Sequence, residues 1–252
     1  MHANTTKSWK RRLLGALPGW LQIAIWAVRR YRWKFGRWPN LIAPQTFNEL
    51  ILLRKISNRD PRILQLADKL LVKDYVREKL GDEWVIPTLW SGKHLPPRDQ
   101  RDWPRPFVIK ANNGCGRNIF VRDQKFHDWD RVESRCDEWM SSAYGLDLGE
   151  WHYARMPARI MVEPFINVDL ELPVDVKFLV FHGCVEFIYV VVNREHGERQ
   201  AFFDRNWNRV PYGQGFEVET APVPAPACLT EMIRGAEILA ADFSFVRVDL
   251  YE

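Results

Sequence analysis

The chain has 252 residues, of which 46% are hydrophobic and 27% charged, so it can bury a core in one domain or two small ones. The formal net charge is +4, yet residues 1–40 hold nine Lys and Arg and no Asp or Glu, which leaves the remainder slightly acidic. This distribution excludes a basic footprint over the whole protein, and we expect no nucleic-acid partner.

The four cysteines are widely and irregularly spaced, without a C-x-x-C pair. Their spacing indicates neither a zinc site nor a redox motif, and reduced thiols in a cytoplasmic protein are the simplest interpretation.

Residues 1–40 form a basic, Trp-rich arm that we expect to be helical. Its uncharged run, residues 13–28, is interrupted by Pro18 and Gly19 and is short for a membrane-spanning helix. One interpretation is an interfacial helix that makes peripheral contact with the inner face of the membrane through residues 10–34. The other is a helix pair that buries its tryptophans, and we expect this one because Trp-rich apolar stretches usually pack into a core.

Residues 41–105 are predicted to be a helical N-terminal part of the main fold. Thr46 and Glu49 have the spacing of a capping box, which predicts a helix that begins here and runs to Ile56. A short helix is expected over residues 61–67.

Asp68 is predicted to cap the next helix, from Lys69 to Leu80. Helical spacing would then place Lys69, Lys73 and Arg77 on one basic face. A loop rich in Pro, Lys and Arg follows over residues 91–105 and predicts a boundary between subdomains.

From residue 106 the pattern favours strands, and we divide the rest into residues 106–158 and 159–252. The expected elements are a hairpin of residues 107–110 and 118–122, a helix over 129–143, a strand over 159–166, a second hairpin of 174–181 and 185–192, a strand over 201–203, a helix over 229–241 and a strand over 243–251. This order predicts an α+β fold with antiparallel sheets and not a doubly wound fold.

A Gly- and Asn-rich turn follows Lys110 at the end of the first predicted strand. Gly114 and Gly116 let the backbone approach a ligand and expose N–H groups that bind phosphate oxygens, and Lys110 would add a positive charge. A tight hairpin would need the same residues for its own geometry, so the turn alone leaves both interpretations open.

Charged residues recur on the later predicted strands. Asp175 and Lys177 share one strand face, as do Arg247 and Asp249, and Glu163 ends a strand of its own. Each group could either form an ion pair within the protein or bind a ligand. Asp249 is a candidate magnesium ligand, and the neighbouring Arg247 is a candidate phosphate-binding cation.

Taken in order, these stretches resemble the TupA-like family of the ATP-grasp superfamily, proteins of teichuronopeptide and cell-surface polysaccharide biosynthesis. The resemblance spans about residues 40–252 and is carried by residues 44–49, 68–69, 75–77, 107–110, 112–116, 151–153, 157–160, 163, 175–178 and 246–251. It implies the ATP-grasp fold, in which two subdomains with antiparallel sheets clasp ATP, here preceded by an N-terminal helical region.

The resemblance also implies a set of site residues. Lys69 and Lys110 would contact phosphate; Asn113, Gly114, Cys115, Gly116 and Asn118 would form the loop over the phosphates; Glu163 would lie at the adenine hinge and Asp175 would bind ribose; Arg194 and Lys177 would serve catalysis; and Asp249 would bind Mg²⁺.

The implied activity is that of an ATP-dependent carboxylate–amine ligase that works through an acyl phosphate, on an amino-acid or sugar-acid substrate of a surface polymer. The alternatives are a nucleotide-binding but inactive homologue and a polysaccharide-biosynthesis protein labelled as a glycosyltransferase. In the family a strand with a second metal-binding acid follows the position of Asp249, whereas this sequence ends at Glu252. We therefore expect the sequence to be a fragment, or to be truncated within its metal site.

Overall fold

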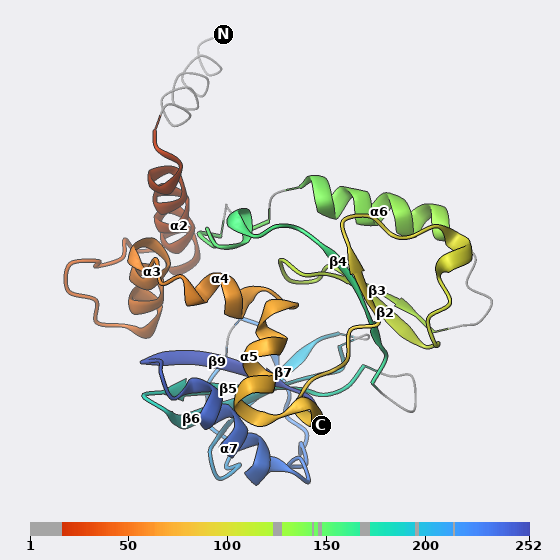
Figure 1. The fold of residues 1–252 in the computed structure, drawn as a ribbon. Coiled ribbons are helices and arrows are strands. Elements are labelled where there is room, and N and C mark those ends of the chain that lie inside the picture. Colours follow the sequence, from red (N-terminus) through yellow and green to blue (C-terminus); the bar gives the residue numbers. More distant parts are fainter. Residues whose placement is uncertain are drawn as a thin grey trace.

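The computed structural model describes residues 17–122, 128–142, 144–145, 148–166, 172–194, 197–213 and 215–252. The expectations for residues 1–16, which include the first basic cluster of the N-terminal arm, lie outside the described residues. The described chain forms two sheets with helices around them (Figure 1).

The first sheet has four antiparallel strands in the order β1-β4-β2-β3. These strands are β1 (Trp90–Gly92), β2 (Phe107–Ala111), β3 (Asn118–Val121) and β4 (Ile160–Pro164). Helix α6 (Trp129–Ser141) covers one face, where Val132, Cys136 and Trp139 pack against inward residues of β2 and β4 (Figure 1). The opposite face carries the charged side chains Lys110 and Glu163.

The second sheet has five strands in the order β8-β7-β6-β5-β9, antiparallel except for the β7–β8 pair. They are β5 (Asp175–Phe181), β6 (Cys184–Val192), β7 (Arg199–Asp204), β8 (Glu217–Val218) and β9 (Phe245–Leu250). Helix α7 (Leu229–Ala240) buries the main core on one face with Phe178, Ile188 and Phe203. The other face bears a smaller aromatic cluster around Tyr189 and Phe202, together with charged side chains of β5 and β9.

The remaining helices precede or connect the sheets. They are α2 (Gly19–Phe35), α3 (Phe47–Ser57), α4 (Arg62–Ala67), α5 (Leu71–Leu80) and the short 3-10 helices at Asp82–Trp84, Arg98–Gln100 and Tyr153–Arg155. Helix α5 bridges the two sheets, because Lys73 forms an ion pair with Glu163 of β4 while the Tyr75 hydroxyl donates to the Leu239 carbonyl of α7 at 2.9 Å.

The α+β class and most predicted elements are confirmed, with three differences. The helix predicted from Lys69 begins at Leu71, because residues 68–70 form a turn in which the Lys69 amide donates to the Asn112 carbonyl at 3.1 Å. Lys69 therefore does not share a helix face with Lys73. Strand β1 overlaps the start of the predicted loop of residues 91–105, and β4 pairs with β2, so the first sheet extends past residue 159.

The expectation that the N-terminal tryptophans are buried is wrong for those on α2. This helix packs on α3 through Ala27, Tyr31 and Leu52, whereas Trp20, Trp26 and Trp33 are 58%, 51% and 81% exposed. Smaller side chains and one tyrosine fill the contact between the helices, so the indole rings face outward. No described helix is both long and apolar enough to cross a membrane.

Candidate functional site

The glycine-rich turn is a tight β2–β3 connection backed by an aromatic ring. Gly114 and Gly116 have φ of 88° and 71°, a conformation that favours glycine. A Cβ at Gly114 would lie 2.7 Å from the ring of Tyr144, so the backbone approaches this ring more closely than a larger residue would allow. The Arg117 guanidinium lies over the same ring and donates to the Trp139 carbonyl at 3.0 Å, which ties the turn to the end of α6.

Three lysines converge beside this turn around one buried carboxylate. Glu163, 4% exposed, forms ion pairs with Lys110 at 2.5 Å and with Lys73. The Lys69 ammonium instead donates to the carbonyls of Gly114 at 2.5 Å and Ala111 at 3.1 Å. Burial, with Lys110 nearby, lowers the pKa of Lys69 to about 8, and burial lowers the pKa of Lys73 as well.

Buried polar residues hold this lysine cluster in place. The Asn112 amide donates to the Asp68 carboxylate at 2.7 Å and to the Pro157 carbonyl at 3.1 Å, and its oxygen accepts from the Arg159 amide at 2.8 Å. The Asp68 carboxylate also accepts from the backbone at the start of α5. Because Asp68 is engaged in this way, Glu163 is the carboxylate that pairs with Lys73 and Lys110, and the cluster of three lysines retains positive charge.

A second charged cluster lies on the face of β5 and β9 opposite α7. The Lys177 ammonium lies 2.6 Å from Asp175 and 2.7 Å from Asp249. Arg247 donates to both oxygens of Asp249, at 2.6 and 2.8 Å. Burial raises the pKa of Asp249, but Arg247 and Lys177 outweigh this effect and hold the pKa below its usual value.

Two further groups stand at the Asp175 end of this cluster. Arg194 follows β6, donates to the Pro173 carbonyl at 3.3 Å and lies within hydrogen-bonding reach of Tyr251. Asp175 is 7% exposed, and among the described residues its Oδ1 atom has no hydrogen-bond partner. A buried carboxylate oxygen without a donor is suited to accept from a ligand hydroxyl.

The structure thus brings the predicted site residues together in two groups. The first contains Lys69, Lys110, Glu163 and the glycine-rich turn, and the second contains Asp175, Lys177, Arg194 and Asp249. Tyr153 interacts electrostatically with Cys115 of the turn and with Arg247 beside Asp249. Within the turn Asn113 is buried, Cys115 is exposed, and Asn118 begins β3 opposite Lys110.

Sequence reasoning did not identify Tyr144 or Tyr153 as part of the site, nor Lys73 as a partner of Glu163. Lys73 and Glu163 are far apart in the chain and meet only because α5 packs beside β4. The two tyrosine rings contact each other edge to face at 5.2 Å between centroids. They follow no short spacing that would have indicated a place beside the turn.

A model of the TupA-like ATP-grasp family matches residues 49–252. Solved structures with similarity include D-alanine–D-alanine ligase from Bacillus anthracis (17% identity, 79% of this chain and 54% of that chain, TM-score 0.44) and from Helicobacter pylori (16%, 80% and 55%, TM-score 0.36). The ATP-grasp ligase PsnB in complex with a minimal precursor matches with 12% identity over 81% of this chain and 54% of PsnB, with a TM-score of 0.39.

The chain spans about half the length of these ligases. No protein with a curated description matches it. The family model covers most of the sequence, including both charged clusters and the glycine-rich turn, and it agrees with the resemblance expected from the motifs. The chain therefore belongs to the TupA-like ATP-grasp family.

Proposed function

We propose that this protein binds ATP with Mg²⁺ and acts as a carboxylate–amine ligase. In this reaction the γ-phosphoryl group passes from ATP to a substrate carboxylate, and an amine then attacks the acyl phosphate, so that an amide forms and phosphate leaves. The proposal rests chiefly on the cluster of Lys69, Lys73 and Lys110 beside the glycine-rich turn, whose backbone N–H groups would bind phosphate oxygens.

The described side chains have the chemistry to hold the nucleotide. Lys69 and Lys110 would contact phosphate oxygens, and the Asn113–Asn118 turn would lie over them. Glu163 would lie near the adenine hinge, and the unpaired Oδ1 of Asp175 would accept from a ribose hydroxyl. Arg194 and Lys177 would then lie toward the transferred group and offset its charge.

Magnesium would bind through Asp249 and the nucleotide phosphates. The described residues contain no group of three or more His, Cys, Asp or Glu that could hold a metal ion. This agrees with the usual preference of Mg²⁺ for one or two carboxylates together with phosphates and water. Both oxygens of Asp249 are engaged by Arg247 and Lys177, so binding would require at least Lys177 to turn away.

The test is ATP affinity, measured by calorimetry with Mg²⁺, for the wild type, Lys110→Gln and the exposed surface control Lys93→Gln. Loss of a charge-assisted contact should weaken binding by roughly tenfold to a hundredfold in Lys110→Gln only. Lys73 still pairs with Glu163 in this variant, so the fold is retained. Equal affinities in the two variants, or no binding to the wild type, would overturn the proposal.

ADP formation separates the ligase from the inactive nucleotide-binding alternative. The protein is mixed with ATP, Mg²⁺ and pairs of amino acids and sugar acids, which represent the expected substrates of a surface polymer. We expect ADP release only when both a carboxylate and an amine are present. Nucleotide binding without ADP release from any pair would favour the inactive alternative.

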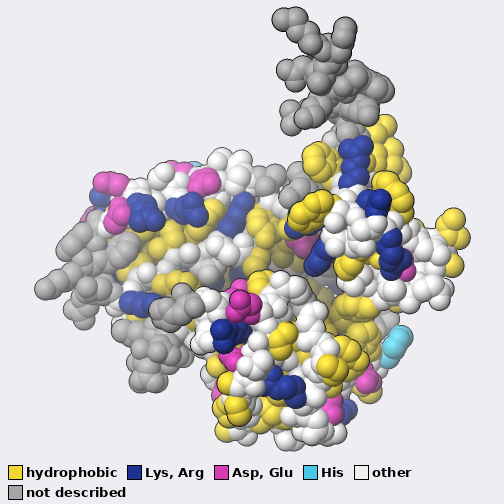
Figure 2. All heavy atoms as spheres, turned by 180° about the vertical axis from the view of Figure 1, so that it is seen from behind, with side chains coloured by type: hydrophobic (Ala, Val, Ile, Leu, Met, Phe, Trp, Pro, Cys, Tyr) yellow, Lys and Arg dark blue, Asp and Glu magenta, His cyan; other side chains and the backbone are white. Residues whose placement is uncertain are grey.

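We further propose a cytoplasmic protein whose helix α2 makes peripheral contact with the inner membrane face. Trp20, Trp26 and Trp33 have exposed indole rings, the second half of the helix carries basic residues that include Arg29 and Arg32, and no Asp or Glu occurs on the helix. Hydrophobic and basic side chains lie side by side along α2, the segment next to the grey N-terminal atoms (Figure 2). Such a surface suits anionic headgroups.

A further inference from the structure

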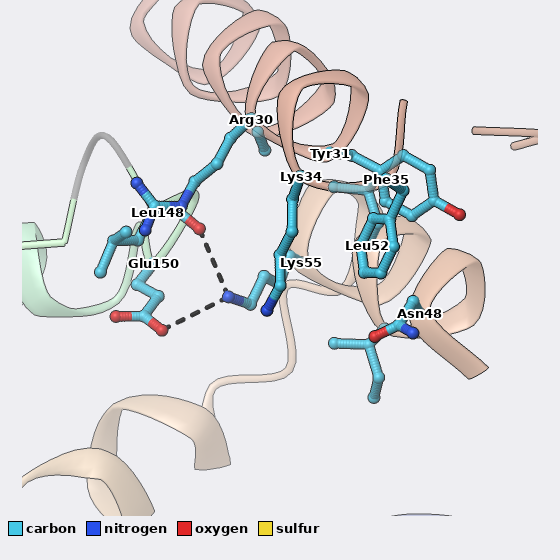
Figure 3. Close-up of a pocket in the computed structure, with 11 residues that line it drawn as sticks. Arg30, Tyr31, Lys34, Phe35, Asn48, Leu52, Lys55, Leu148 and Glu150 are labelled. Atoms are coloured by element: carbon cyan, nitrogen blue, oxygen red, sulfur yellow. Dashed lines mark hydrogen bonds and ion pairs between the residues drawn. The ribbon is translucent and has the colours of Figure 1, made fainter. Parts of the chain in front are cut away.

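A hollow lies away from the two charged clusters, between α2, α3 and residues 148–150 (Figure 3). Its volume is about 270 Å³, which is enough for a small organic molecule. Ala27, Tyr31 and Leu52, the residues that join α2 to α3, form part of its wall. The hollow is thus built on the helix pair and is distinct from the residues assigned to ATP.

Three basic side chains line this hollow. Lys55 from α3 donates to the Leu148 carbonyl at 3.3 Å and lies 3.4 Å from the Glu150 carboxylate. Arg30 and Lys34, both from α2, form no ion pair with any described residue. In Figure 3 the Lys34 and Lys55 side chains point into the same hollow, and Arg30 reaches toward Leu148.

The charge of the hollow indicates the class of its occupant. The Glu150 carboxylate offsets the charge of Lys55. The positive charges of Arg30 and Lys34 therefore have no counter-charge among the residues that line the hollow. Two negative charges on one small molecule would match them, and an organic body would cover Phe35, which is 39% exposed, and the partly exposed Ile51. A neutral molecule or a bare hydrocarbon would leave the two cations without a counter-charge.

Glu150 of the hollow is connected to the glycine-rich turn through two tyrosines. The Glu150 amide donates to the Gly145 carbonyl at 2.8 Å, and the Tyr153 amide donates to the Glu150 carbonyl at 3.2 Å. Tyr153 in turn contacts Tyr144, whose ring lies against Gly114. One pair of tyrosines therefore stands between the hollow and the turn proposed to cover the phosphates.

We propose that this hollow binds a small organic dianion, either a phosphate ester or a dicarboxylate on an apolar or ring-shaped body. Because Tyr153 and Tyr144 connect the hollow to the glycine-rich turn, we assign the dianion as a co-substrate of the ligase, and this role rests on the function proposed above. Binding itself requires only Arg30, Lys34, Lys55 and the wall they surround.

Phenyl phosphate, phthalate and benzyl alcohol are suitable probes, because they share an aromatic body and differ in charge and in the type of anion. Calorimetry should show binding of at least one dianion and none of benzyl alcohol to the wild type. Arg30→Gln should weaken that binding by about tenfold, since a charged partner is lost. The dianion that binds more tightly identifies the class, phosphate ester or dicarboxylate.

The matched control is Arg29→Gln, which removes the same charge from the neighbouring exposed position of α2, outside the hollow. Equal loss in Arg29→Gln and Arg30→Gln would overturn the proposal, as would equal binding of all three probes. Lys110→Gln shows whether a dianion has bound instead at the phosphate-contacting lysines. Dianion binding that depends on Lys110 and not on Arg30 would also refute the site.

ATP affinity measured on the same variants keeps the two proposals separate. Arg30→Gln should bind ATP as the wild type does, because Arg30 is outside the nucleotide site. If ATP does not bind but the binding of phenyl phosphate or phthalate still depends on Arg30, the dianion site is supported and the ligase proposal is refuted. If ATP binds but the binding of neither dianion depends on Arg30, the ligase proposal is supported and the dianion site is refuted.

Discussion

Lys69, Lys73 and Lys110 lie close together but have different partners. Lys110 and Lys73 pair with Glu163, whereas Lys69 contacts only backbone carbonyls among the described residues. A buried ammonium without a carboxylate partner is costly to keep charged, and this is the physical reason for its lowered pKa. Lys69 is therefore the lysine whose charge is most sensitive to a phosphate ligand.

We predict that ATP affinity falls as the pH rises through about 8, the pKa of Lys69 in the free protein. Phosphate favours the protonated lysine, so binding above this pH must take up a proton. Calorimetry in buffers of different ionisation enthalpy measures this uptake. Lys69→Gln should bind ATP more weakly and take up no proton; uptake that persists in this variant would assign the titration to another group.

The lowered pKa of Lys69 also makes the stability of the folded protein depend on pH. The pKa of Lys69 is lower in the folded protein than its ordinary value of 10.5, so between about pH 8 and 10.5 the unfolded chain binds more protons. The contribution of Lys69 to stability therefore increases with pH across this window. Below pH 8 the folded protein bears the full cost of a buried charge.

At the scale of single elements, α3 shows how one carboxylate organises a helix start and the loop before it. The Thr46 hydroxyl accepts from the Glu49 amide at 3.4 Å, and the Glu49 carboxylate accepts from the Thr46 amide at 3.1 Å. Glu49 is 1% exposed and also accepts from Arg37 at 2.7 Å and from the Asn40 amide at 3.1 Å. The capping box therefore fixes the chain between α2 and α3.

We predict that Thr46→Ala lowers the free energy of unfolding by about 1 kcal/mol, the usual value of a lost N-cap hydrogen bond. For a chain of this length the melting temperature should fall by about 2–4 °C. The control is Ser57→Ala at the other end of α3. The exposed Ser57 hydroxyl donates only to the Leu53 carbonyl, so its loss should lower the melting temperature less. Equal melting temperatures in the two variants would mean that the capping box adds no stability.

Most elements, including the box at Thr46 and the hairpins at Gly114 and Gly183, could be predicted because their signals lie within a few neighbouring residues. The cap at Asp68 was also predictable, and its carboxylate accepts from the Leu70 and Leu71 amides. The regular helix nevertheless begins at Leu71, and the Lys69 amide donates to the Asn112 carbonyl of the glycine-rich turn. That contact across the fold could not be predicted from neighbouring residues.

At the scale of the molecule, α4 and α5 lie between the two sheets, and α2 stands at one side (Figure 1). Arg54 of α3 donates to the Phe245 carbonyl of β9 at 2.6 Å, so the helix pair is attached to the second sheet. This attachment leaves the outer face of α2, with Trp26 and Trp33, directed to solvent.

We predict that the protein sediments with vesicles that contain phosphatidylglycerol more strongly than with neutral vesicles, and less strongly as salt is raised. Trp33→Ser should weaken binding by about tenfold because a large exposed ring is lost. Phe216→Ser removes another exposed aromatic ring, 50% exposed and distant in sequence, and should have no effect. The same vesicle affinity for both variants would exclude α2 as the contact surface.

The sequence by itself determined the α+β class, the two hairpins, the caps and the family, because periodicity, turn chemistry and motif order are properties of residues near one another in the chain. Only the tertiary structure decided that Glu163 meets Lys73, that Lys177 joins Asp175 to Asp249, and that a basic hollow forms against α2. These contacts depend on strand order and helix packing, which the pattern of any single segment does not specify.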